Sequence, residues 1–112
     1  MKKKFVWIIV HHEFYQVWQD GKPVGYAHDG IVMHMASSLK KAEKYIESVM
    51  VDRFSWWGIT KQKVDDTDFT KEGENLTRWY TCRGVFVSTA YLPPARIIKR
   101  AEKWYKKEKE NG

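Results

Sequence analysis

Histidine and acidic side chains are grouped in the N-terminal third of the chain, where they are suited to hold a metal ion or to act as a general base. The group consists of His11, His12, Glu13, His28, Asp29 and His34. Imidazole and carboxylate together suit zinc or iron. On a strand, however, His11 and His12 point to opposite faces, so only one of them can join a cluster. We therefore expect histidines that solvate strand ends, with no bound metal or cofactor, and keep a small metal-dependent enzyme using His11, His12, Glu13 and His28 as a further alternative.

Cys82 is the only cysteine of the chain. A cysteine nucleophile needs a positioned base, and the four histidines lie elsewhere in the sequence. We therefore expect Cys82 to be a buried cysteine on a strand. A lone cysteine also excludes an internal disulfide and fits a reducing compartment, which favours the cytoplasm.

Positive charge is concentrated near the C-terminus. The formal net charge is +6, and residues 95–112 hold seven basic and three acidic residues. Cations that neutralise phosphates, combined with aromatic rings that stack on bases, are typical of surfaces that bind nucleic acid. The candidate binding residues of this kind are Arg78, Tyr80, Arg83, Arg96, Lys99, Arg100 and Lys103. A solvated helix surface would show the same pattern, so nucleic acid is the alternative partner rather than the first.

Trp56 and Trp57 are adjacent, and the chain holds six tryptophans and six tyrosines in all. So many rings are difficult to hide in a small core, and half-exposed rings often serve as contacts. One ring of the pair should enter the core, while its neighbour points away and covers something else. We expect Trp57, with Tyr80, to anchor a protein partner or a twofold dimer contact, and packing under a loop is the alternative.

Strands are predicted wherever apolar residues run together or alternate. Residues 5–10 form a continuous apolar run typical of a central strand, and residues 14–19 read as a second strand. The Asp20-Gly21 turn leads to a third strand over residues 24–28. Residues 31–35 are either another short strand or its continuation past a bulge. Later strands are expected at residues 59–64, 78–82 and 85–90.

Two amphipathic helices are predicted from apolar residues spaced three and four apart. The first follows Ser37-Ser38, which can cap its free amides, and the second follows Pro93-Pro94. Their apolar faces are formed by Leu39, Ala42, Tyr45, Ile46, Val49, Met50 and Phe54, and by Ile97, Ile98, Ala101, Trp104 and Tyr105. The expected fold is a single α+β domain over residues 1–112. Its antiparallel sheet of about five strands has both helices on one face, in the order β-β-β-α-β-β-α.

Residues 5–66 carry a pattern of strand, hairpin, helix and strand. The helix begins Ser37-Ser38-Leu39-Lys40-Lys41-Ala42-Glu43-Lys44-Tyr45-Ile46, and the strand runs from Trp57-Gly58-Ile59 to Asp65-Asp66. This pattern resembles small uncharacterised proteins of bacteriophages and mobile elements. The resemblance implies a small accessory protein of phage or mobile-element origin, similar to compact anti-defence inhibitors. The aromatic segment from residue 75 onward lies outside it.

Together these observations predict a cytoplasmic protein without catalytic activity that acts by binding a macromolecule. A protein partner, inhibited through the contact, is preferred to nucleic acid, and a homodimer is a further option. No membrane partner is expected, because the apolar run of residues 5–10 is too short for a signal peptide or a bilayer span.

Overall fold

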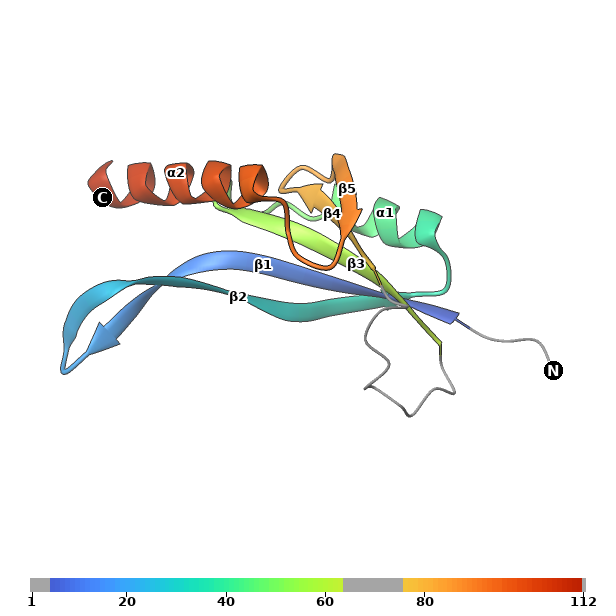
Figure 1. Cartoon of the computed structure of the whole chain (residues 1–112), viewed down its shortest axis with the longest axis horizontal. Coiled ribbons are helices and arrows are strands. Elements are labelled where there is room, and N and C mark those ends of the chain that lie inside the picture. Colours follow the sequence, from blue (N-terminus) through green and yellow to red (C-terminus); the bar gives the residue numbers. More distant parts are fainter. Residues whose placement is uncertain (1–4, 64–75, 112) are drawn as a thin grey trace.

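The computed structural model describes residues 5–63 and 76–111, which form one sheet and two helices (Figure 1). The elements are β1 (Phe5–Gln19), β2 (Lys22–Ala36), α1 (Leu39–Ser48), β3 (Ser55–Lys63), β4 (Thr77–Thr81), β5 (Phe86–Ala90) and α2 (Ala95–Asn111). The sheet has the strand order β2-β1-β3-β4-β5, and every neighbouring pair is antiparallel. The predicted α+β class, with about five antiparallel strands and two helices, is confirmed. The acidic residues Asp65 and Asp66 lie outside the described residues.

The order along the chain differs by one strand from the expected one, because α1 lies between β2 and β3. The N-terminal strands predicted separately are a single strand, β1, that continues through His11-His12-Glu13. The histidines do not form a turn because their rings pack on aromatic neighbours of the sheet. His11 lies 4.7 Å from the Trp57 ring, and His12 stacks on Trp56 at 5.5 Å with an angle of 5° between the rings.

The turn between β1 and β2 follows the prediction, and the structure decides between the two alternatives for residues 31–35. Asp20 and Gly21 have φ angles of 52° and 76°, as a two-residue hairpin turn of the mirror-image type requires. In β2, the register with β1 shifts between His34 and Val32, so Met33 is an extra, bulged residue. Residues 31–35 are therefore the continuation of one long strand. Figure 1 shows this β1–β2 hairpin as a long arm at one end of a molecule that is 55 Å in its longest dimension.

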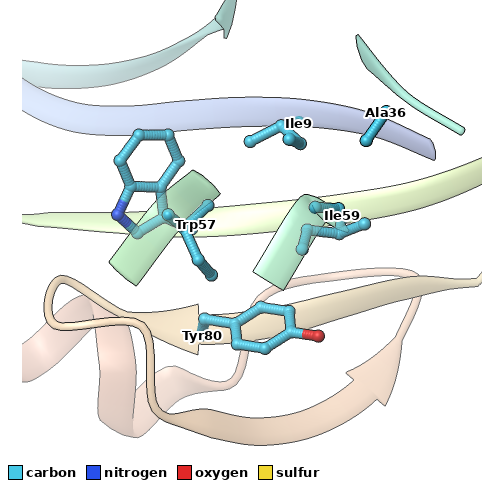
Figure 2. Close-up of a cluster of buried hydrophobic side chains, with 7 residues drawn as sticks. Ile9, Ala36, Trp57, Ile59 and Tyr80 are labelled. Carbon is cyan, nitrogen blue, oxygen red and sulfur yellow. The ribbon is translucent and has the colours of Figure 1, made fainter. Parts of the chain in front are cut away.

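The two helices do not share a face of the sheet, contrary to the expectation. Helix α1 packs on a cluster that contains Ile9, Trp57, Ile59 and Tyr80, whose side chains lie together in Figure 2. Helix α2 packs on a separate cluster built on Phe14, Trp56 and Trp79. Neighbouring residues of a strand point to opposite faces, as the pairs Trp56–Trp57 and Trp79–Tyr80 do. The sheet is thus covered by α1 on one face, called the α1 face, and by α2 on the other, the α2 face.

Helix α1 begins as the sequence predicts and ends earlier. The Ser38 hydroxyl accepts a hydrogen bond from the backbone N–H of Lys41 at 3.2 Å, which caps the helix. The helix ends at Ser48, and Val49 has an extended backbone. Met50, expected on the apolar face, is 98% exposed. Three residues of the predicted apolar stripe, Val49, Met50 and Phe54, therefore belong to the connection to β3.

Gly30 makes room for the ring of His12, its partner across β1 and β2. A Cβ at Gly30 would lie 2.5 Å from Cε1 of His12 and 2.8 Å from Cγ1 of Val10. The His12 ring cannot swing away freely because it is stacked on Trp56 and also lies against Trp79, in a tilted contact. We expect Gly30→Ala to lower the free energy of unfolding by about 1–3 kcal/mol, measured by urea denaturation. In a His12→Ala background the same change should cost less than half as much, and an equal cost in both backgrounds would contradict this packing.

The His12 ring also makes stability depend on pH. Burial lowers the pKa of His12 from 6.5 to about 4, with further lowering by the charges of His28 and His11. Below pH 6.5 this histidine is protonated in the unfolded chain but stays neutral in the folded chain. Its contribution to the free energy of unfolding is therefore complete above pH 6.5 and decreases as the pH falls towards 4. We expect His12→Phe, which keeps a ring against Trp56, to reduce the acid-induced loss of unfolding free energy by about 1–2 kcal/mol. This range takes into account that His12 is partly exposed. Unfolding curves at pH 7 and pH 4.5 test this, and an unchanged difference between them would refute it.

Candidate functional site

A cavity of about 440 Å³ lies beside the first half of α2, where β3 begins and β4 ends. Three arginines line it: Arg53, Arg96 and Arg100. The other lining residues are polar or apolar and include no acid: Ser55, Thr81, Cys82, Phe86, Val87, Ile97 and Ala101. Guanidinium groups stay charged at all physiological pH values. This arginine cavity, as we call it, therefore has a positive rim and a partly apolar wall.

The position of α2 places two of the three arginines. Ile97, Ala101 and Tyr105 are buried against the sheet and fix the orientation of the helix. Arg96 and Arg100 are one turn apart, so they lie next to each other on the helix surface. Arg96 Nη2 donates a hydrogen bond to the carbonyl oxygen of Val87 at 3.4 Å, which holds its side chain towards β5.

Arg53 reaches the cavity from the connection between α1 and β3. Its Cζ lies 4.4 Å from the centre of the Trp104 ring, and Lys107 Nζ lies 5.0 Å from the same ring. Such cation–π contacts hold a cation beside an indole at about 0.5–1 kcal/mol where the pair is exposed. Sequence analysis missed Arg53 because it lies far from α2 in sequence. Trp104, expected in the core, is half-buried and serves as the platform for the two cations.

The remaining cations of α2 extend the positive surface along the helix. Arg96, Lys99, Arg100 and Lys103 are all exposed, as the sequence predicts for a basic face. The carboxylate of Glu102 forms an ion pair with Lys106 at 3.1 Å, one turn along the helix. This acid therefore neutralises a lysine outside the arginine cavity, and the rim of the cavity keeps its positive charge.

The expectation that Trp57 and Tyr80 are exposed anchors is wrong. They are 0% and 1% exposed, because α1 covers their face of the sheet (Figure 2). The Tyr80 hydroxyl donates to Glu43 Oε2 at 2.7 Å and accepts from Arg78 Nε at 3.0 Å. Burial raises the pKa of Tyr80 to about 12. Both residues thus stabilise the packing of α1, and neither lines the arginine cavity.

Arg78 and Arg83 also lie apart from the cavity lining. Arg78 Cζ is 4.3 Å from the centre of the Phe86 ring, on the α1 face. Arg83 is exposed in the turn between β4 and β5, where its backbone N–H donates to Thr81 Oγ1 at 3.3 Å. Of the eight candidate binding residues, Arg96 and Arg100 line the cavity, and Lys99 and Lys103 lie on the same helix.

The histidines are divided between the two faces. His34 stacks on Tyr45 at 4.4 Å on the α1 face, and His28 lies 5.2 Å from Trp56 on the α2 face. Burial lowers the pKa of His11, which favours its neutral form. Among residues 5–63 and 76–111, no three His, Cys, Asp or Glu side chains gather closely enough to hold a metal ion.

Cys82 is half-buried and lies in the turn after β4 rather than on a strand. It contributes to the wall of the arginine cavity together with Thr81. The expectation of a buried strand cysteine is therefore corrected. Within the described residues, neither helix is long and apolar enough to cross a membrane.

No protein-family model, curated protein or solved structure matches the chain. The resemblance to proteins of phages and mobile elements thus stays a prediction. The functional interpretation has to come from the geometry of the arginine cavity and of the surfaces around it.

The hydroxyl of Tyr80 provides a test of its structural role. Tyr80→Phe removes the hydrogen bonds to Glu43 and Arg78 and keeps the ring in the core. We expect it to lower the free energy of unfolding by about 1 kcal/mol. Urea denaturation measures this change, and an unchanged free energy of unfolding would contradict the structural role.

Proposed function

We propose that the protein binds single-stranded nucleic acid, with the arginine cavity and the basic face of α2 as its contact surface. The observation that carries the proposal is the convergence of Arg53, Arg96 and Arg100 around a concave surface whose lining contains no carboxylate. These side chains come from two segments that are distant in the sequence. A solvated helix surface explains Arg96 and Arg100, but it does not explain why Arg53 lies beside them.

Arginine is suited to phosphate because its planar guanidinium donates two parallel hydrogen bonds to one anion. The basic face of α2 continues from the cavity through Lys99 and Lys103. A 17-residue helix is about 25 Å long, so its cations can follow several successive phosphates. Neutralising these phosphates would provide most of the affinity and make it depend strongly on salt.

A single strand fits the cavity better than a duplex does. Beside the arginines, the lining of the cavity includes the apolar residues Phe86, Val87, Ile97 and Ala101. A volume of about 440 Å³ falls in the range of pockets that take small organic ligands, and one unstacked nucleotide is of that class. In a duplex the bases are paired and stacked, whereas a single strand presents their faces to apolar and aromatic side chains.

A protein partner would need exposed anchors at Trp57 and Tyr80, and both rings are buried. Nucleic acid is therefore the preferred partner. The inhibitor role, the phage origin and the lack of catalysis stay predictions. A cytoplasmic location, where single-stranded RNA or DNA occurs and Cys82 stays reduced, belongs to the proposal.

The double variant Arg96→Gln/Arg100→Gln tests the proposal directly. We expect it to bind a labelled 12-nucleotide single strand at least tenfold more weakly than the wild type at 50 mM salt, because charge-assisted contacts to phosphate are lost. The slope of log affinity against log salt should fall by about 0.7 for each phosphate contact removed. Fluorescence anisotropy over 50–200 mM salt measures both quantities.

A matched control is Lys40→Gln/Lys44→Gln, which removes the same charge from exposed positions on α1. Its affinity and salt slope should stay within twofold of the wild type. Equal effects of the two double variants would indicate attraction by net charge alone. The absence of salt-sensitive binding at micromolar protein, or tighter binding of a duplex of the same length, would refute the proposal.

A further inference from the structure

The outer edge of β2 is the least protected part of the sheet. β2 is an edge strand of fifteen residues, whereas the opposite edge is formed by the five-residue strand β5. Along an edge strand, every second residue directs its backbone N–H and C=O groups away from the sheet. Soluble proteins protect such edges with short strands, proline or charged side chains, lysine above all. In β2 the only lysine and the only proline are Lys22 and Pro23, at the start beside the turn, and the one other charged residue is Asp29.

The side chains of β2 are unusually apolar for an exposed strand. Six large hydrophobic residues on it are more than a third exposed: Val24, Tyr26, Ile31, Val32, Met33 and Met35. Ile31 is 63% exposed and Met35 is 57% exposed. Helix α1 reaches β2 at His34, whose ring stacks on Tyr45, and α2 reaches it at Tyr26, whose ring lies 5.4 Å from that of Tyr105. The other five residues of the group are still 44–63% exposed. Exposed apolar side chains on a long edge strand mark an interaction site or an aggregation hazard.

From this edge we infer that β2 pairs with β2 of a second copy of the chain, so that two five-stranded sheets join into one continuous antiparallel sheet. A twofold axis makes the two strands antiparallel, which continues the pattern of every pair already in the sheet. The same axis brings the exposed side chains of the two β2 strands along one shared seam. The inference stands apart from nucleic-acid binding, because the arginine cavity and β2 share no residue.

Charge also favours a second copy as the occupant of this edge. The chain has a formal charge of +6, yet β2 after Lys22 contains one charged residue, Asp29. A polyanion would find no cation on the strand beyond Lys22, whereas two identical edges that each carry a single acid can meet with little repulsion. Only a register that places Asp29 opposite its own copy is disfavoured, since like charges directly opposite each other destabilise a sheet.

The bulges of β2 limit where the pairing can be regular. Register shifts against β1 at both ends of β2 leave residues 25–32 as an uninterrupted segment. These eight residues exceed the usual strand length of about five or six, so they can support a complete strand pair. Ile31 and Val32 lie at one end of the segment, where a twofold axis near Gly30 would bring them close to residues 28 and 29 of the other copy.

Sedimentation velocity with light scattering between 1 and 100 µM, in 150 mM salt, tests the inference. The wild type should have twice the chain mass of 13.3 kDa. Ile31→Lys places a cation in the edge of both copies and should weaken the dimer about a hundredfold or more. Met50→Lys adds the same charge at a site that is 98% exposed and outside β2, and it should leave the dimer intact.

Val32→Lys is a second edge variant, in case Ile31→Lys does not fold, and circular dichroism reports folding for each. Amide hydrogen exchange gives an independent readout. Amides of residues 25–32 should be protected at 100 µM and should exchange faster at 1 µM, where the dimer dissociates. A wild type that is monomeric at 100 µM, or a dimer that both lysine variants leave unchanged, would overturn the inference.

Discussion

Trp56 and Trp57 are neighbours on β3, and neither has any surface exposed to water. A strand directs successive side chains to opposite faces, so two adjacent indoles can be buried only if both faces of the sheet are covered. Helix α1 covers Trp57, and α2 covers Trp56. Burying aromatic side chains of this size contributes several kcal/mol of the stability of so small a protein. The three-layer arrangement thus rests on this pair of residues.

The location of the arginine cavity follows from that arrangement. Because α2 packs over Trp56 with Ile97, Ala101 and Tyr105, the flank that carries Arg96 and Arg100 overhangs the beginning of β3. The chain enters β3 from the connection that carries Arg53, two residues before Ser55. The contacts that bury the core therefore also bring the three guanidinium groups together. Function at this site would depend on a helix held in place by apolar packing.

Two adjacent histidines in the middle of β1 are held in the strand by packing against aromatic rings. Adjacent polar residues such as these are ordinarily expected at the end of a strand or in a turn. His11 and His12 instead continue the strand because each lies against a tryptophan ring of β3. Gly30 leaves space for one of these rings on the β2 side. The long hairpin is thus held to the sheet by aromatic contacts, while the outer edge of β2 remains open.

The sequence by itself determined the local elements. Apolar periodicity, the Asp20-Gly21 turn, the Ser38 cap and Pro93-Pro94 are short-range signals, and they predicted the α+β class, both helices and most strands. The basic face of α2 was also predictable, because charge is visible in sequence. Only the tertiary structure decided which face each helix covers, that Trp57 and Tyr80 are buried, and that Arg53 joins the cavity. Periodicity shows that a face is apolar, but it does not show which distant surface will cover it.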